Sequence, residues 1–205
     1  MLPSPSDLVR QITQLQHAAV AAWHEVPPSN TYTGLLNTVC QQHQFNFELW
    51  HEEDIARSPD VTDARIAAVK RAIDRFNQQR NDYIERIDEA VLELLAREAI
   101  LPRAGARLNT ETPGSAVDRL SIMSLRIYHF EEQLTRDGAD DKHRANVTER
   151  LARCRLQHAD LSQSLAELLD DIWAGRKLLK VYRQMKMYND PSLNPYLYKA
   201  QRLAG

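Results

Sequence analysis

Apolar residues recur at intervals of three and four along almost the whole chain, and this spacing predicts α-helices joined by short turns. Glycine and proline are few and stand mainly where helices are expected to begin or end. The pattern predicts helices over residues 6–24, 33–57, 62–99, 113–136 and 141–187, followed by a tail over 188–205. We therefore expect an all-α, up-and-down bundle of about five helices, with long third and fifth helices, in a single domain over residues 1–205.

The third predicted helix carries polar residues within its hydrophobic stripe. At about 100° per residue, the stripe contains Ile66, Val69, Ile73, Ile84, Ile87, Val91 and Leu95. Asn77 and Arg80 lie in the same stripe, and Asn81 and Asp88 lie at its edges. An amphipathic helix normally places such residues on its opposite face, and an unpaired buried charge is costly. These groups are therefore expected either to meet polar partners on another helix or to line a cleft.

The second predicted helix repeats this feature, because His43 and Asp54 share its apolar stripe. If the second and third helices form a hairpin, His43 lies level with Asn77 and close to the level of Arg80. Two interpretations follow. Either these side chains bind a small anionic ligand, or they form a buried network in which Arg80 pairs with Asp118. On the first interpretation, the candidate ligand-binding residues are His43, Asp54, Asn77, Arg80, Asn81 and Asp88.

Acidic residues of these two helices are superficially similar to the paired carboxylates that hold Mg²⁺ in all-α nucleotide pyrophosphatases. In a simple hairpin, however, Asp88 lies about 22 residues beyond the level of Asp54, which is about 33 Å at 1.5 Å per residue. One ion does not bridge that distance, so we predict no metal site from these acids. His51, His129 and His158 have no ligand-type residue four positions later in the chain and are interpreted as core or surface histidines. We assign no catalytic residue, because the chain has no nucleophile pattern and no glycine-rich phosphate loop.

The fourth and fifth predicted helices differ in pattern. The fourth is apolar on two sides, which is typical of a helix in the middle of a bundle. The fifth has a heptad-like seam that includes Val147, Leu151, Cys154, His158, Leu161, Leu165, Leu168, Ile172, Gly175, Leu179 and Tyr182. Because the third and fifth helices would each be about 50 Å long or more, we expect their ends to pack in a homodimer.

The end of the chain is basic and contains several tyrosines. Arg176, Lys180 and Arg183 would share one face if the fifth helix continued to residue 187, and they form a candidate anion-binding patch. The alternative is that these cations are solvated and the tyrosines pack the tail against the bundle.

Composition narrows the classes of function. A net charge of −2 and a pI near 6.4 make nucleic acid an unlikely partner. No signal peptide and no membrane-spanning run is visible, and Cys40 and Cys154 are interpreted as small core residues rather than a disulfide. We expect a soluble, cytoplasmic protein.

Four separate motifs carry a resemblance to a known family. They are Trp50–Arg57, Asn77–Asp88, Glu111–Ser115 together with Asp118–Ile122, and Lys186–Pro191. From about Phe45 to Tyr198 the chain resembles the bacterial, all-helical family catalogued as domain of unknown function 4254. The resemblance implies no established activity and no cofactor. It implies a link to cell-surface sugar assembly, because members are often encoded near glycosyltransferases.

Two classes of function therefore stay open. The leading one is a non-catalytic binding or accessory protein of polysaccharide or lipopolysaccharide assembly, with sugar-transfer enzymes as protein partners. Its expected contact surfaces are the seam of the fifth helix and the basic tail. The alternative is an enzyme that acts on a phosphorylated small molecule or nucleotide, with or without a metal.

Overall fold

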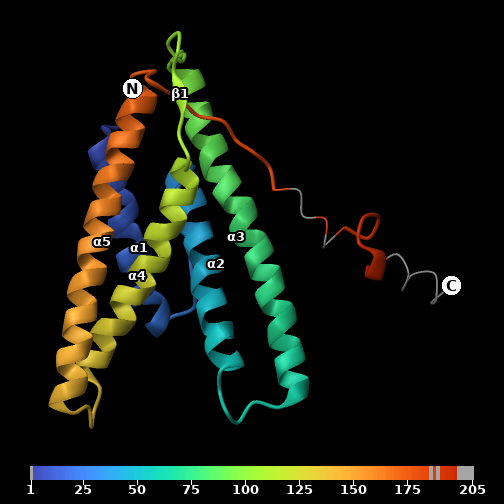
Figure 1. Cartoon of the computed structure of the whole chain (residues 1–205), viewed down its shortest axis with the longest axis vertical. Coiled ribbons are helices and arrows are strands. Elements are labelled where there is room, and N and C mark those ends of the chain that lie inside the picture. Colours follow the sequence, from blue (N-terminus) through green and yellow to red (C-terminus); the bar gives the residue numbers. More distant parts are fainter. Residues whose placement is uncertain (1, 185–186, 188–189, 198–205) are drawn as a thin grey trace.

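The computed structural model describes residues 2–184, 187 and 190–197, so parts of the predicted tail and of the Lys186–Pro191 motif lie outside the described residues. The helices are α1 (Pro5–Glu25), α2 (Gly34–Ala56), α3 (Asp63–Arg97), α4 (Pro113–Thr135) and α5 (Asp141–Trp173). Two short strands, β1 (Arg107–Leu108) and β2 (Lys177–Leu178), form a parallel pair. The predicted all-α bundle is confirmed (Figure 1).

Side-chain caps explain where four of the helices begin. The oxygens of Ser4, Thr62, Thr112 and Asp140 each accept a hydrogen bond from the backbone N–H three residues later. Such a cap satisfies one of the N–H groups that a first helical turn leaves unpaired. Capping residues are recognisable in a sequence, and the predicted starts of these helices agree with the structure to within one residue.

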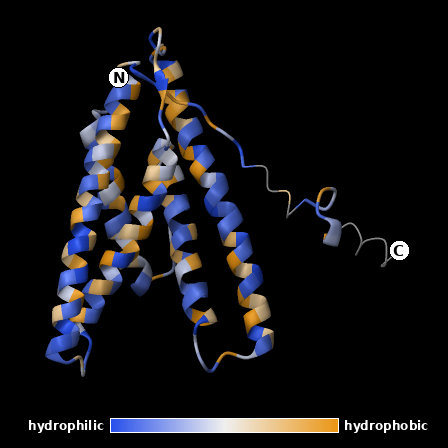
Figure 2. Ribbon diagram, in the orientation of Figure 1, coloured by the Kyte–Doolittle hydropathy of each residue, from blue (hydrophilic) through white to orange (hydrophobic). Residues whose placement is uncertain are grey.

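The helices form two antiparallel hairpins with α1 packed against them. One hairpin is α2–α3 and the other is α4–α5, and the two diverge toward one end of the molecule (Figure 1). Helix α4 contacts every other helix, which confirms its predicted central position. Apolar and polar positions alternate around each helix (Figure 2). The largest fully buried apolar side chains, drawn from all five helices, are Ile12, Val20, Val39, Ile87, Leu120, Leu125, Ile127, Leu165 and Leu169.

The predicted extent of the fifth helix is wrong, because α5 ends at Trp173 rather than at residue 187. Gly175 has φ +68°, and its N–H donates to the carbonyl of Ile172 at 3.0 Å. The N–H of Arg176 donates to the carbonyl of Asp171 at 2.7 Å. This pair of bonds is a Schellman cap, which ends a helix at a glycine in the left-handed conformation. The glycine is also required sterically, because a Cβ there would lie 2.7 Å from the carbonyl oxygen of Leu101.

Beyond this cap the chain is extended, and β2 pairs with β1 in the loop that joins α3 to α4. Three positions of the predicted heptad seam, Gly175, Leu179 and Tyr182, therefore lie outside the helix. Leu179 is still buried, in a cluster with Val91 and Leu95 of α3, whereas Tyr182 is 70% exposed. The apolar spacing continues past Gly175 because the extended segment also covers core, and this continuation explains the overlong prediction.

Three expectations about surface and core can be compared with the structure. Cys40 and Cys154 are buried and free, as expected of small core residues. Among the described residues, no helix is long and apolar enough to cross a membrane. Ile66, at the start of the α3 stripe, is 37% exposed, because the α2–α3 hairpin extends away from the other helices at this end (Figure 1).

Candidate functional site

Arg80, a polar residue of the predicted stripe of α3, meets Asp118 of α4, which is only 4% exposed. Arg80 of α3 donates to both carboxylate oxygens, from Nε at 2.7 Å and from Nη2 at 2.6 Å. From α2, Gln42 donates at 2.6 Å and Asn46 at 3.0 Å. Asp118 thus accepts four hydrogen bonds from two helices, and the anticipated pairing of Arg80 with Asp118 is present. A bidentate, charge-assisted pair of this kind fixes the register of the helices that carry it.

His43 belongs to the same group of hydrogen-bonded residues and lies inside the bundle. Its Nδ1 lies 2.7 Å from the hydroxyl oxygen of Ser121, which also accepts from Asn46 at 2.8 Å. His43 is completely buried, and burial lowers its pKa to about 3, so the imidazole is neutral at pH 7. A ligand could reach this ring only if the helices separated. We call these six residues the Asp118 network: Gln42, His43, Asn46, Arg80, Asp118 and Ser121.

Asn77 and Asn81 lie beside the Asp118 network on α3. The Oδ1 atom of Asn77 lies 3.5 Å from Nη1 of Arg80, and both asparagines are half-buried. Arg80 itself keeps 24% of its side chain exposed. Its hydrogen bonds to Asp118 raise its pKa above the ordinary arginine value, so its charge is permanent. The edge of this guanidinium is therefore a fixed positive group at the surface.

Asp88 lies elsewhere, about two helical turns or about 12 Å along α3 from Arg80. Its Oδ1 accepts a hydrogen bond from the N–H of Gly114 in the first turn of α4, at 2.7 Å. A Cβ at position 114 would overlap the carbonyl oxygen of Ile84, so this close approach requires glycine. Burial raises the pKa of Asp88 to about 6, against the opposing effect of its bonds to Thr112 and Gly114. Asp88 therefore joins α3 to the N-terminus of α4 and does not share a site with Arg80.

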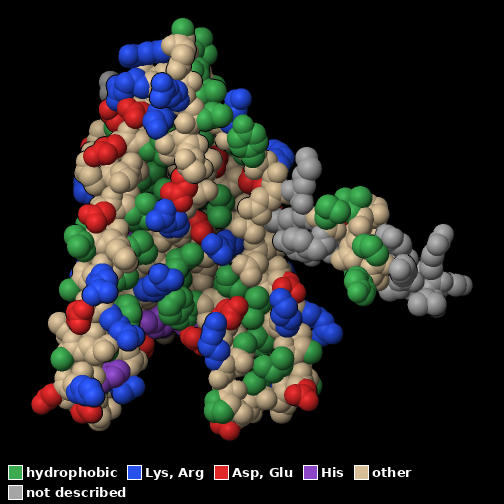
Figure 3. Space-filling model, viewed as in Figure 1, with side chains coloured by type: hydrophobic (Ala, Val, Ile, Leu, Met, Phe, Trp, Pro, Cys, Tyr) green, Lys and Arg blue, Asp and Glu red, His purple; other side chains and the backbone are tan. Residues whose placement is uncertain are grey.

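Two pockets open where the hairpins diverge. One of about 330 Å³ is lined by Asn46, Leu49, Trp50, Glu53, Asp54, Arg57, Arg80, Ile122 and Leu125. The other, of about 500 Å³, is lined by His24, Trp50, His51, Asp54, Arg126, His129, Phe130, Glu132 and Gln133. Both share Trp50 and Asp54, and we call the two pockets together the cleft. Figure 3 shows the surface hollowed between the hairpins, with charged groups of both signs beside it. Of the predicted ligand-binding residues, Asp54 and Arg80 line the cleft.

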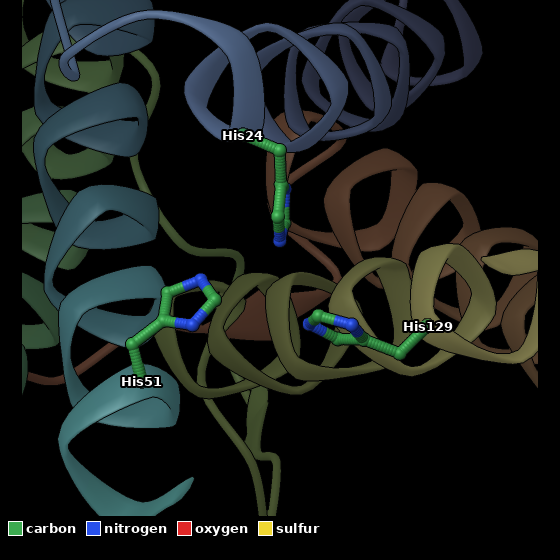
Figure 4. Close-up of side chains that lie close together, drawn as sticks. All are labelled: His24, His51 and His129. Atoms are coloured by element: carbon green, nitrogen blue, oxygen red, sulfur yellow. The ribbon is translucent and has the colours of Figure 1, made fainter. Parts of the chain in front are cut away.

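Three histidines from three helices converge at one wall of the cleft: His24 of α1, His51 of α2 and His129 of α4. One nitrogen from each lies within 4.8 Å of the other two (Figure 4). We call them the histidine cluster. The histidine cluster was not predicted, because His51 and His129 were interpreted singly and His24 was not among the candidate residues. The sequence carries no local signal for it, because the three residues stand far apart along the chain. Three imidazoles so placed could hold a metal ion.

Aromatic side chains surround the histidine cluster. Trp50 stacks on His129 with centroids 4.9 Å apart, and Tyr128 stacks on His24 at 4.2 Å. Burial lowers the pKa of His51, and repulsion from the other two imidazoles lowers it further, while Asp54 and Glu132 act in the opposite direction. The environment therefore favours the neutral form of the His51 imidazole, with carboxylates close by.

The residues of the predicted anion-binding patch do not share a helix face, because α5 ends before them. Arg176 pairs with Asp170 at 2.6 Å and with Asp171 at 2.7 Å, at the C-terminus of α5. Arg183 pairs with Glu89 of α3, and Lys180 is exposed on the extended segment between them. The two arginines are thus already bound to acidic groups. The seam of α5, the other expected contact surface, is largely buried against α1 and α4.

Comparison with curated proteins and with solved structures gives no significant match. The sequence model of a family described as "Protein of unknown function (DUF4254)" matches residues 36–181, which is more than two thirds of the chain. The match includes nearly all of α2 and the whole of α3, α4 and α5. With them it includes the Asp118 network, His51, His129 and every residue that lines the two pockets except His24. The chain therefore belongs to the DUF4254 family.

Proposed function

We propose that this protein is a non-catalytic binding or accessory protein of cell-surface polysaccharide or lipopolysaccharide assembly, and that its ligand site is the cleft. The observation that carries the proposal is that two pockets meet at Trp50 and Asp54, beside walls whose positions the Asp118 network fixes. A concave site with apolar walls and a few fixed polar groups is typical of small-molecule binding. Because the walls are rigid, little conformational freedom is lost when a ligand enters.

The lining of the cleft suggests a ligand class. Trp50 and Leu49 offer flat apolar surface to a base or a sugar ring, while Arg57, Arg126 and the exposed edge of Arg80 offer positive charge. A phosphorylated small molecule such as a nucleotide sugar combines both features. This class also fits a protein that works beside sugar-transfer enzymes.

We further propose that the protein is a homodimer in the bacterial cytoplasm. Ile66 is 37% exposed at the end of the α2–α3 hairpin that the other helices leave uncovered, and a second copy would bury it. Two free, buried cysteines suit a reducing compartment. Size-exclusion chromatography with light scattering tests the dimer, and a monomer at tens of micromolar would refute it.

A second candidate function is an enzyme that acts on a phosphorylated small molecule in the same cleft. The observation that favours it is the histidine cluster, with Asp54 and Glu132 lining the same pocket. A neutral imidazole at His51, beside these carboxylates, can accept a proton. Turnover of a bound ligand would move this candidate ahead of the binding protein.

Thermal unfolding against nucleotides, nucleotide sugars and sugar phosphates tests ligand binding, with a chelator present so that metals play no part. A ligand at a hundred times its dissociation constant adds about 2.7 kcal/mol, which raises the Tm of a chain of this size by about 5–11 °C. Trp50→Ala removes the wall common to both pockets and should abolish the rise. Trp173→Ala, at the end of α5 and outside the cleft, is the matched control and should keep it. A flat panel, or a rise unaffected by Trp50→Ala, would refute the cleft as the ligand site.

A further inference from the structure

We propose that His24, His51 and His129 bind one divalent transition-metal ion, with Zn²⁺ as the expected ion, through their three Nε2 atoms. The proposal stands independently of the ligand proposed for the cleft. It rests on four features of the histidine cluster: its tautomers, its unpaired nitrogens, its geometry and the charges beside it.

Hydrogen bonds fix the tautomer of two of the rings. Nδ1 of His24 lies 2.7 Å from the carbonyl oxygen of Val20, and a carbonyl oxygen can only accept. Nδ1 of His129 lies 3.1 Å from the Glu132 carboxylate, which when ionised also only accepts. Each Nδ1 therefore carries the proton, and each neutral ring has its lone pair on Nε2. Metal-binding histidines almost always donate their second N–H to a carbonyl or a carboxylate in this way.

The three Nε2 atoms are buried and have no hydrogen-bond partner among the described residues. A polar atom withdrawn from water without a partner costs free energy. One nitrogen of each ring lies within 4.8 Å of a nitrogen of each other ring, and Trp50, Phe47 and Tyr128 pack against the three rings. Proton sharing would satisfy at most one pair of neighbouring nitrogens, whereas one metal ion accepts all three lone pairs.

The geometry is close to that of a three-histidine metal site. Tetrahedral Zn–N bonds of about 2.0–2.1 Å place the ligand nitrogens about 3.3 Å apart. The cluster nitrogens lie within 4.8 Å of one another, so the rings close on an ion through side-chain rotation of about an ångström. The planes of the three rings are inclined to one another by 71°, 77° and 78°, which lets each ring point edge-on at one centre.

The surroundings favour a borderline transition metal and leave a coordination position open. Imidazole ligands suit Zn²⁺, Co²⁺, Ni²⁺ and Cu²⁺, whereas Mg²⁺ and Ca²⁺ prefer oxygen. Asp54 and Glu132 supply negative charge near the ion. Three protein ligands leave a fourth position, typical of sites that also hold water or a ligand atom. That position would face the pocket of about 500 Å³, where Arg126 could hold an anionic group.

Calorimetric titration of the untagged, metal-free full chain with Zn²⁺ tests the proposal. We expect one ion per chain, no comparable binding of Mg²⁺ or Ca²⁺, and the visible absorption of four-coordinate Co²⁺ when Co²⁺ is used as the probe. Glu132→Gln should weaken Zn²⁺ affinity about 10–100-fold, the range found when a group that orients a metal ligand is lost. Glu131→Gln, which removes the neighbouring surface carboxylate that pairs with Arg155, should leave the affinity unchanged.

Direct removal of a ligand completes the test. His51→Ala should abolish stoichiometric Zn²⁺ uptake, whereas His17→Ala, an exposed histidine on α1, should not. If His51→Ala fails to fold, the Co²⁺ spectrum of the wild type and the effect of Glu132→Gln still decide the question. The proposal is wrong if the wild-type chain takes up no Zn²⁺, or if Glu132→Gln and His51→Ala bind it as tightly as the wild type does.

Discussion

Replacing Asp118 with asparagine should destabilise the fold strongly, although the side chain keeps its shape. The carboxylate accepts two bonds from Arg80 and one each from Gln42 and Asn46. Asparagine keeps one acceptor oxygen but presents an N–H₂ group where the second oxygen stood, so a donor then faces a donor. The half-buried guanidinium also loses its counter-charge.

The magnitude follows from burial. Breaking a buried ion pair by removing one partner costs about 3–5 kcal/mol. Because Arg80 is 24% exposed and can turn partly to water, we expect the lower end of this range, about 3 kcal/mol. For a chain of this size that is a fall in Tm of about 6–12 °C. Urea unfolding followed by circular dichroism measures the same loss as a shift in midpoint with an unchanged slope.

A matched surface pair provides the control. Both carboxylate oxygens of Glu111 accept a bond from Nη1 of Arg119, at 2.8 and 2.7 Å, but these two side chains are 40% and 55% exposed. Glu111→Gln should therefore cost about 1 kcal/mol or less. If Asp118→Asn costs no more than Glu111→Gln, the Asp118 network does not hold the three helices together and our reading of it is wrong.

Three further changes test the contacts of the backbone and of Asp88. Because the pKa of Asp88 is raised in the folded state, the folded protein binds this proton more tightly than the unfolded protein between about pH 4 and pH 6. The stability of the wild type relative to Asp88→Asn should therefore fall by up to about 3 kcal/mol as the pH rises through this range, and stay level above it. Urea unfolding at each pH measures this difference, and a constant difference would contradict the prediction. Gly114→Ala forces a Cβ against the carbonyl of Ile84 and should lower the free energy of unfolding by about 1–3 kcal/mol in the same assay. An unchanged free energy of unfolding would contradict the close packing of α3 and α4. Gly175→Ala should lower the free energy of unfolding more than Gly138→Ala does. Both glycines have positive φ, so both variants incur about 1–2 kcal/mol of strain, but of the two only position 175 has a backbone atom that would clash with a Cβ. Equal losses would show that this clash is easily relieved.

Much of the fold is readable from the sequence because local signals and apolar spacing agree. Thr62, Thr112 and Asp140 mark helix starts that the structure places within one residue of the prediction. The end of α5 was not predicted, since Gly175 weakens a helix interior by only about 1 kcal/mol while the apolar spacing continues to Leu179. The Schellman cap at Gly175 and its tertiary contact with the α3–α4 loop together make it a stop.

The candidate site was likewise predicted only in part. Polar residues in the stripes of α2 and α3 indicated either a ligand site or a buried network, and the second alternative named Asp118 as the partner of Arg80. The histidine cluster was not predicted, because ligand-spacing rules find histidines one turn apart on one helix. His24, His51 and His129 each come from a different helix, and only the packing of α1 and α2 on α4 brings them together.

The metal ion that we propose would lie at the wall of the cleft where these three helices meet. X-ray diffraction at the zinc absorption edge, from crystals of the untagged chain grown with Zn²⁺, tests that placement most directly. We predict one strong anomalous peak, within about 2.0–2.1 Å of each Nε2 of His24, His51 and His129. A cluster without a peak, in crystals where Zn²⁺ is bound at other residues, would contradict it.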